Sequence, residues 1–512
     1  MPSLPEPNRR HALYVLLALA LSALSLVAHL NLTLLSGIHE ARVLETGREM
    51  LELHNWVVPH FIGELRLEKP PLPYWASALA YKMAGEPSVT AARLVTALLG
   101  LLMLLASWLI ARAVSDRHTA LLVLPVLAGF LLFNTEFRKV TTDPFLAALT
   151  TAAVAAFAWA FRRPGRSGTA CLSLAYLFTA LALLAKGPIA LVFIGIGAGF
   201  VKPRAADSVR IAWQWHALGV ILACAPIAGW AAMVMQQLPD ALALWRHEVW
   251  GRVTGDVEEM RGRWFYFPVM LSAVSPLLLP FLAGTFRGLR QRDPMALWLA
   301  SGMVFLLLLS SRKAAYLLPL MAPAALLTAQ YLSKMPHYRE AGWLGWAQLL
   351  INLLLIAALF GAALAWRDHL SWGAASLGLL LLLSALALLR NALRARPSVA
   401  SLVVSGVLIT TFYNGVLQTH LPEDRTIYNL SAYINEHVPA RIALYQQGST
   451  DPRLAFYLNR LPTPIEDARL GEVGSPAWLL RRDPLPDAAG SGWQAVLQTQ
   501  SRKGKIIYLY QR

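Results

Sequence analysis

Acidic and basic side chains gather in the loops that we expect on one side of a membrane. The first of these loops carries His39-Glu40-Ala41-Arg42 and, further on, Glu68-Lys69-Pro70. Ionisable groups near membrane depth are costly and usually functional, although an arginine or lysine at the end of a span can also simply extend to the interface. We expect the loops to form one site, to which four later loops contribute Arg138, Lys139 and Asp143; Lys186; Glu248, Arg252 and Asp256; and Arg312, Lys313 and Tyr316.

This mixture of charges suits chemistry on a phosphate. Several fixed cations bind a phosphate and stabilise the negative charge of a departing phosphate. One or two carboxylates can orient a nucleophile, accept its proton or hold a divalent metal ion. Outside the membrane there is neither ATP nor nucleotide sugar, so an activated donor has to arrive on a lipid. The residues therefore predict transfer of a group from a lipid phosphate.

Apolar helices must position these loops. Hydrophobic residues make up 56% of the 512 residues and charged residues only 14%, whereas a soluble domain has roughly 25% charged residues. A bilayer core requires about 20 apolar residues in a helix. We expect an all-α polytopic membrane protein with about 13 transmembrane helices, the first over 12–35 and the others beginning near residues 88, 119, 143, 169, 187, 213, 264, 294, 314, 342, 371 and 401.

The basic residues of alternate loops predict the orientation. Arginines and lysines fill the loops on the N-terminal side, for example Arg162, Arg163 and Arg166, which places the N-terminus in the cytoplasm. An odd number of spans then places the C-terminus outside. Topology thus accounts for most of the formal net charge of +16, and we expect no nucleic acid partner. Both cysteines lie in apolar runs, so no disulfide framework is predicted.

Two outer segments are long. In the first, Glu45, Arg48 and Glu49 alternate with apolar residues at helical spacing, which predicts an amphipathic helix on the membrane surface. After about residue 421 the composition becomes that of a soluble protein, with strands expected at 441–447, 477–482, 494–498 and 505–510 and helices at 425–437 and 452–458. We therefore expect a transmembrane domain over 1–420, including outer interfacial helices over 36–87, and a small periplasmic α/β domain over 421–512.

The motifs and their order resemble the polyprenyl-phosphate-sugar-dependent glycosyltransferases of the GT-C superfamily. They are most similar to the bacterial aminoarabinose transferases that modify lipid A and to their protein mannosyltransferase relatives. The resemblance covers roughly the first 330 residues and is carried by Glu40-Ala41-Arg42, Arg48-Glu49-Met50-Leu51, Trp56-Val57-Val58-Pro59-His60, Glu68-Lys69-Pro70, Thr142-Asp143-Pro144, Ala185-Lys186-Gly187, Glu248 with Arg252, and Ser311-Arg312-Lys313 with Tyr316.

The resemblance implies roles for individual residues. Asp143 resembles an active-site acid of the family, and Glu68 and Lys69 resemble its outer-loop motif. Donor or acceptor phosphate would be bound by Lys69, Arg42, Lys186, Arg252, Arg312, Lys313 and Tyr316. By analogy the site holds either no cofactor or a divalent metal ion, with Glu68 and His247 as its ligands.

The first loop departs from the family. Where the family usually has the pair Asp-Glu, this chain has His39-Glu40. Three alternatives follow. His39 acts as the base, since imidazole titrates near neutrality; Glu40 takes over the role; or the acceptor is already an anion, such as a phosphate of lipid A. The predicted catalytic residues are therefore Glu40, His39 and Asp143.

The resemblance implies transfer, with inversion, of a sugar from undecaprenyl phosphate to an acceptor at the periplasmic face of the bacterial inner membrane. Lipid A is the expected acceptor, membrane lipids surround the protein, and a protein hydroxyl is the alternative acceptor. A transporter or flippase for a lipid-linked sugar is the alternative from another class. It predicts ionisable residues near mid-bilayer and two related halves, and the sequence shows neither clearly.

Overall fold

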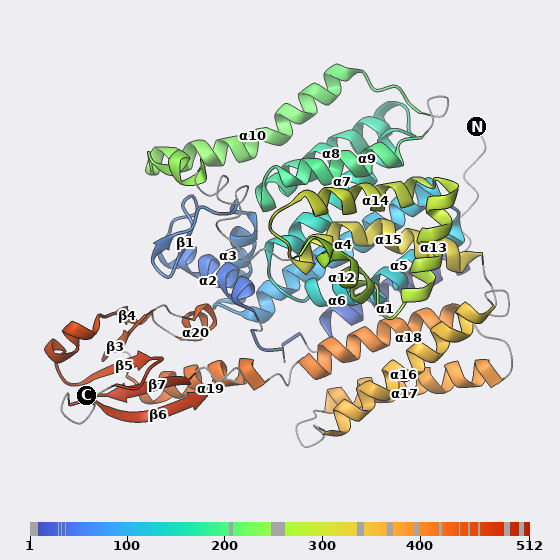
Figure 1. The fold of residues 1–512 in the computed structure, drawn as a ribbon. Coiled ribbons are helices and arrows are strands. Elements are labelled where there is room, and N and C mark those ends of the chain that lie inside the picture. Colours follow the sequence, from blue (N-terminus) through green and yellow to red (C-terminus); the bar gives the residue numbers. More distant parts are fainter. Residues whose placement is uncertain are drawn as a thin grey trace.

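The structure, a computed structural model, is a helical bundle with a small sheet domain at one end (Figure 1). It describes residues 9–28, 30–31, 33–35, 37–203, 208–246, 262–334, 342–365, 372–393, 399–418, 422–439, 441–448, 451–458, 461–485, 492–500 and 506–512.

Among the described residues, eight helical segments are long and apolar enough to cross a membrane. They are α4 (Val89–Val114), α7 (Thr142–Ala160), α8 (Gly165–Lys186), α10 (Trp213–Gln237), η3 with α15 (Ala314–Ser333), α16 (Trp343–Ala365), α17 (Trp372–Leu393) and α18 with η5 (Val399–Leu417).

Shorter apolar helices occupy the other predicted spans. The segment η2 with α12 (Arg263–Ala273) and the helix α13 (Leu278–Gln291) meet at 120°. Four helices contain shorter apolar stretches: α1 (Arg9–Val27), α5 (Arg117–Gly129), α9 (Ile189–Val201) and α14 (Pro294–Leu308). Each predicted span thus contains an apolar helix, and the protein is a multi-span membrane protein. The number of 13 membrane crossings remains a prediction.

Local sequence explains several helix ends. Ser88, Asp116 and Asp293 precede α4, α5 and α14, and their side chains accept hydrogen bonds from backbone amides of the first turn, as N-cap residues do. Gly187 follows α8 with a φ of +79°, which glycine adopts without strain. The chain therefore turns directly into α9, and this turn fixes the position of Lys186.

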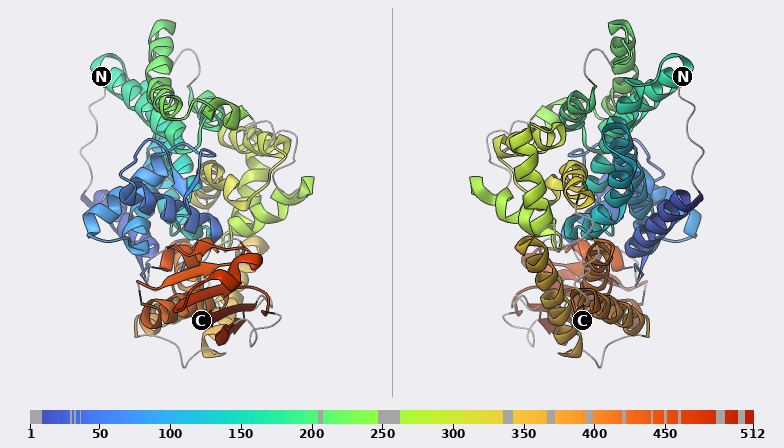
Figure 2. Two further views of the ribbon diagram at one scale, coloured as in Figure 1. Left: turned by 90° about the vertical axis from the view of Figure 1, so that its left-hand side faces the viewer. Right: turned by 90° about the vertical axis from the view of Figure 1, so that its right-hand side faces the viewer.

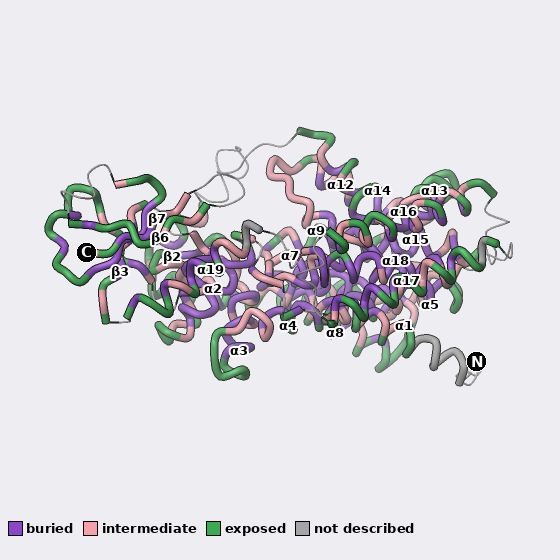
Figure 3. Tube along the Cα trace, turned by 90° about the horizontal axis from the view of Figure 1, so that it is seen from below, coloured by how far each residue is buried: buried purple, intermediate pink, exposed green. Residues whose placement is uncertain are grey.

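The core lies around α7. The apolar window of α7 is 89% buried, whereas that of α10 is only 22% buried. Eight alanines from Ala147 to Ala160 let neighbouring helices approach α7 closely. Figure 3 shows the buried chain along the middle of the bundle. Consequently α7 is surrounded by protein, and α10 presents most of its surface to lipid.

The first outer segment folds into two helices and a hairpin. These are α2 (Ile38–Glu52), the strands β1 (His60–Phe61) and β2 (Glu64–Leu65), and α3 (Leu72–Ala84). The predicted helix is present, but the expectation that its charged face is exposed at a membrane surface is wrong. Glu45, Arg48 and Glu49 are all buried, because α3, the hairpin and the C-terminal domain pack around α2.

The C-terminal residues form the predicted α/β domain. It contains α19 (Pro422–His437), α20 (Pro452–Tyr457), a short 3₁₀ segment η7 (Asp467–Glu472), and a five-stranded sheet in the order β4-β3-β5-β7-β6. The strands are β3 (Ala443–Gln446), β4 (Thr463–Pro464), β5 (Ala477–Arg481), β6 (Gln494–Gln500) and β7 (Ile506–Gln511). The two-residue β4 and η7 were not predicted from the sequence.

This domain contacts the first outer segment through α20. The Arg48 guanidinium donates to the carbonyl of Leu458 at 3.0 Å, and the Leu35 amide donates to the Tyr457 hydroxyl at 2.9 Å. Phe456 packs into the same apolar cluster as Leu44 and Tyr81. Figures 1 and 2 show the sheet domain at the end of the bundle where α2 and α3 lie.

Candidate active site

Asp143 and Lys186 form an ion pair where two neighbouring helices meet. α7 begins at Thr142 and α8 ends at Lys186, and the short turn at 161–164 makes the two helices antiparallel. The Lys186 ammonium donates to the Asp143 carboxylate, and both side chains are largely buried, with exposed fractions of 7% and 13%. An acid in the first turn and a lysine in the last turn also complement the helix dipoles. Two residues predicted from separate loops are thus brought together.

A third predicted loop reaches the same place. The Lys186 ammonium lies 4.2 Å from the centre of the Tyr316 ring, a distance at which a cation is attracted to an aromatic face. The Tyr316 hydroxyl lies 3.5 Å from the Ser311 hydroxyl. In the same loop, Arg312 donates to the carbonyl of Leu307 at 3.4 Å, and Lys313 immediately precedes η3. Asp143, Lys186 and Tyr316 are therefore one group.

Glu136, which was not among the predicted site residues, lies beside this group. It ends α6 (Leu131–Glu136), and its carboxylate is 3.6 Å from the Lys139 ammonium. Burial raises the pKa of Glu136, Lys139 opposes this rise, and the negative charges of Asp143 and Glu40 add to it. A carboxyl with a raised pKa beside another acid is suited to proton transfer. The sequence signal that could have identified Glu136 is its position three residues before Lys139, the spacing of an ion pair.

Glu40 makes a different set of contacts. Its carboxylate accepts from the Arg93 guanidinium at 2.8 and 2.9 Å and from the Val140 amide at 3.0 Å. Arg93 also donates to the backbone carbonyls of Leu30, Thr33 and Leu34. Both side chains of the pair are 1% exposed, so Glu40 joins α2 to α4 and to the connection before α7. His39 lies on the exposed side of α2.

The motif Glu68-Lys69-Pro70 lies beside the Lys186 turn. A Cβ atom built on Gly187 would lie 4.0 Å from the Pro70 ring. Lys69 is half-buried, and Glu68 is exposed with its carboxylate 3.6 Å from the Arg66 guanidinium. The first-loop motif and the Lys186 motif, predicted from distant parts of the sequence, are therefore neighbours.

The hairpin before this motif is held by Glu49. The Glu49 carboxylate accepts from the amide of Ile62 and, at 3.1 Å, from the amide of Gly63. Both turn residues have positive φ, 54° and 75°, which is unusual for a β-branched residue such as isoleucine. Burial raises the pKa of Glu49, and the two amides oppose this rise. Glu49 therefore fixes the turn that leads to Lys69.

Two arginines flank a hairpin ring. The guanidinium carbons of Arg42 and Arg66 lie 6.0 and 5.4 Å from the centre of the Phe61 ring, and Arg66 donates to the Tyr74 hydroxyl at 3.2 Å. The buried Nε of Arg42 has no hydrogen-bond partner within the described part of the chain. Arg42 was predicted and Arg66 was missed. The pair forms a second positive region on the first outer segment.

The described residues include no candidate metal cluster. Among the described residues, no group of three or more histidine, cysteine, aspartate or glutamate side chains could hold a metal ion. Glu68 instead approaches Arg66. His247 and Arg252, predicted as a metal ligand and a phosphate ligand, lie outside the described residues. The donor set that the structure describes therefore does not fit a metal ion.

Known proteins share this architecture. Residues 13–233 match the family of dolichyl-phosphate-mannose-protein mannosyltransferases. Two bacterial relatives bear the name undecaprenyl phosphate-alpha-4-amino-4-deoxy-L-arabinose arabinosyl transferase. The one from Pseudomonas savastanoi is 30% identical, with 57% of this chain and 56% of the relative covered. The one from Sodalis glossinidius is 31% identical, with 57% and 54% covered. The match thus spans a little over half the length of each relative.

The likeness to a solved structure extends over the whole chain. The crystal structure of ArnT from Cupriavidus metallidurans bound to undecaprenyl phosphate superposes with a TM-score of 0.76 at 19% sequence identity, and the match covers 98% of this chain and 97% of that one. The fold is therefore shared along the full length. The resemblance predicted from the sequence is confirmed: residues 13–233 match the mannosyltransferase family, and the whole chain shares the fold of the ArnT crystal structure.

Proposed function

We propose that this protein is a glycosyltransferase that moves a sugar from undecaprenyl phosphate to an acceptor at the periplasmic face of the bacterial inner membrane. The observation that carries the proposal is the Asp143–Lys186–Tyr316 group, which joins a carboxylate, a cation and an aromatic ring from three separate helical segments. The relatives named arabinosyl transferases support 4-amino-4-deoxy-L-arabinose as the sugar. Lipid A is the acceptor that the family resemblance of the sequence motifs implies.

The proposed reaction is a single displacement. An oxygen of the acceptor attacks C1 of the sugar from the side opposite the phosphate, the bond between C1 and the phosphate oxygen breaks, and undecaprenyl phosphate leaves with both electrons of that bond. Lys186 binds the leaving phosphate, assisted by Lys69, Arg42, Arg312 and Lys313, because fixed cations stabilise its developing charge.

The proton of the acceptor has two candidate destinations. Asp143 is released from Lys186 as the phosphate takes over that cation, and it then orients or deprotonates the acceptor hydroxyl. Glu136 is the second candidate, since burial raises its pKa and it lies near Asp143. A lipid A phosphate, being already an anion, would need little help from either. Glu40 is engaged by Arg93, which argues against it as the base, and His39 stays a prediction.

The proposed placement follows from the charge pattern. With the N-terminus in the cytoplasm, the Asp143–Lys186 end of the bundle and the domain over 421–512 lie on the periplasmic side. The contacts of the C-terminal domain with Arg48 and Leu35 support a position of this domain beside the first outer segment.

Purified protein in lipid nanodiscs tests the proposal directly. We expect radiolabelled undecaprenyl-phosphate aminoarabinose to label lipid A, and mass spectrometry to find the added sugar on a phosphate. Label that joins a peptide hydroxyl instead would favour the protein acceptor. Label that crosses liposomes without joining any acceptor would overturn the enzyme proposal in favour of a flippase.

A further inference from the structure

An apolar groove lies at the far end of α8 from the candidate active site. Its cavity of about 680 Å³ lies between α8, α10 and the connection at 209–212. A helix rises about 1.5 Å per residue, so the 22 residues of α8 place the start of the helix roughly 33 Å from Lys186. The groove is walled mainly by apolar and aromatic side chains, among them Leu172, Tyr176, Leu177, Trp215, Leu218 and Leu222.

A second groove lies on the opposite side of α8. Its cavity of about 290 Å³ is bounded by α4, α7 and α8. From α8 it is lined by Cys171, Leu174 and Phe178, whereas the first groove is lined by residues such as Leu172 and Tyr176. At about 3.6 residues per turn, these two sets lie on opposite faces. The first half of α8 therefore separates the two apolar grooves.

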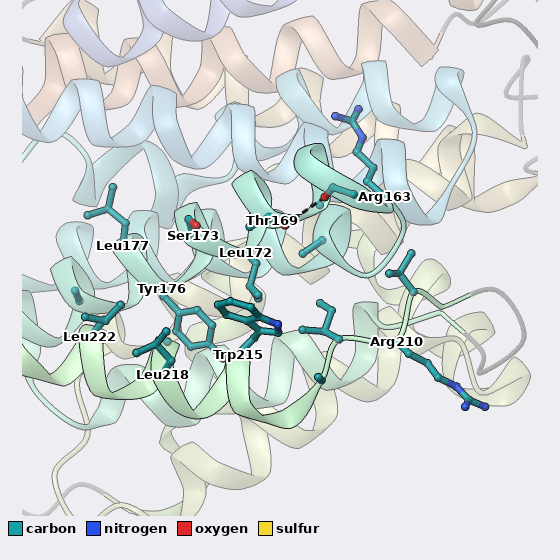
Figure 4. A pocket seen from close by; sticks show the side chains of 18 of the residues that line it. Arg163, Thr169, Leu172, Ser173, Tyr176, Leu177, Arg210, Trp215, Leu218 and Leu222 are labelled. Atoms are coloured by element: carbon teal, nitrogen blue, oxygen red, sulfur yellow. Dashed lines mark hydrogen bonds between the residues drawn. The ribbon is translucent and has the colours of Figure 1, made fainter.

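The two grooves meet at one cation. Arg163 lines both of them, and Arg210 lines the first. Both side chains are exposed. Figure 4 shows the two arginines toward one end of the first groove, with Leu177 and Leu222 toward the other. Neither cavity is lined by a carboxylate within the described part of the chain. The arrangement complements an amphiphile with an anionic head.

The walls of the site are fixed before any ligand binds. The Arg163 guanidinium lies 4.4 Å from the centre of the Trp159 ring, which holds it by a cation–π contact. Tyr176 and His216 share a hydrogen bond of 2.8 Å between α8 and α10. A Cβ on Gly219 would lie 2.2 Å from the Tyr176 ring, so glycine lets the helices approach closely there. Such a preformed groove lowers the entropic cost of binding.

We propose that these grooves bind one anionic phospholipid with two acyl chains. Arg163, which lines both grooves, binds its phosphate, because a guanidinium group matches the geometry of phosphate oxygens. Arg210 adds positive charge at the same end of the first groove (Figure 4). One chain lies on each side of α8, against the apolar walls. With the predicted orientation, this end of the bundle faces the cytoplasmic leaflet, where anionic lipids attract basic residues.

Native mass spectrometry of the delipidated full-length protein tests the proposal. We expect titration with phosphatidylglycerol to give one tightly held lipid, and phosphatidylcholine with the same chains to bind much more weakly. The double variant Arg163→Ala/Arg210→Ala should weaken phosphatidylglycerol binding about tenfold, equivalent to ~1.4 kcal/mol. The matched control is Arg290→Ala, since exposed Arg290 stacks 5.5 Å from the Phe286 ring but lines neither groove. It should bind like the wild type.

A second measurement locates the lipid and does not depend on the arginines. A phosphatidylglycerol with a photoreactive acyl chain should crosslink to α8 together with α10 or α4. Ser173→Trp should reduce crosslinking to α10, since Ser173 is exposed and lines the first groove. Equal binding of both lipids, unchanged binding by the arginine variant, crosslinks spread over all lipid-facing helices, or a dimer that protects α8 would each overturn the proposal.

Discussion

Replacing Glu40 by glutamine separates a structural from a catalytic role for the first-loop acid. The Glu40 carboxylate accepts three hydrogen bonds, two from Arg93 and one from the Val140 amide, and the ion pair is 1% exposed on both sides. In Glu40→Gln the negative charge disappears, and the amide NH₂ faces the donors of Arg93. Arg93 is then a buried cation without its counter-charge.

The expected cost is large. Removing one partner of a buried ion pair destabilises a protein by about 3–5 kcal/mol, because the other charge stays buried. Replacing both partners by apolar residues is often close to neutral. The double variant Glu40→Leu/Arg93→Met should therefore be more stable than Glu40→Gln. The double variant should still be less stable than the wild type, since Arg93 also donates hydrogen bonds to the carbonyls of Leu30, Thr33 and Leu34.

Two measurements on the same preparations are needed. Unfolding in mixed detergent micelles, followed by tryptophan fluorescence, gives the change in the free energy of unfolding. The rate of sugar transfer, normalised to folded protein, gives the effect on chemistry. We expect Glu40→Gln to unfold much more easily while its folded fraction keeps most of its turnover. His39→Ala, on the exposed side of the same helix, is the control for stability. Wild-type stability with turnover lost by about 100-fold or more would refute the structural role.

Three other perturbations follow from the same contacts. Asp143→Asn should lower transfer by about 100-fold or more, whereas Asp116→Asn, at an N-cap where asparagine also serves, should keep it; equal rates in both would contradict the proposed site. Burial raises the pKa of Glu45 from 4.5 to about 7, against the opposing effect of Arg48. The folded state thus keeps a proton that the unfolded chain releases, and the free energy of unfolding should fall as the pH rises from about 4.5 to about 7. Glu45→Gln should make the free energy of unfolding less dependent on pH in this range, and an unchanged dependence would exclude Glu45 as its source. Arg48→Ala removes the hydrogen bond to Leu458 and should increase hydrogen–deuterium exchange in α20; unchanged exchange there would show that the apolar contacts suffice.

The pairing of Asp143 with Lys186 was within reach of the sequence. A short turn between two apolar segments makes them antiparallel, so the start of one and the end of the next must lie at the same side. The motif order indicated that both belong to one site. The C-terminal α/β domain was also predictable, because its alternating strands and helices follow a stretch of purely apolar helices.

The contacts of α2 were not predictable in the same way. Its residues alternate as in a surface helix, and the burial of Arg48 depends in part on contacts with the C-terminal domain, about 400 residues later in the chain. Arg93 gave a signal that was not used, since a charged residue inside an apolar span usually has a partner. That partner is Glu40, the residue for which a catalytic role was predicted.

In the proposed reaction, Lys186 binds the phosphate of a lipid-linked donor beside Asp143. The most direct test is the affinity of the purified protein for undecaprenyl phosphate, measured by titration for Lys186→Met and for Lys82→Met, a control at the exposed end of α3. We expect Lys186→Met to bind about tenfold more weakly or worse, equivalent to at least ~1.4 kcal/mol, and Lys82→Met to bind like the wild type. Equal affinity in all three proteins would contradict this role of Lys186.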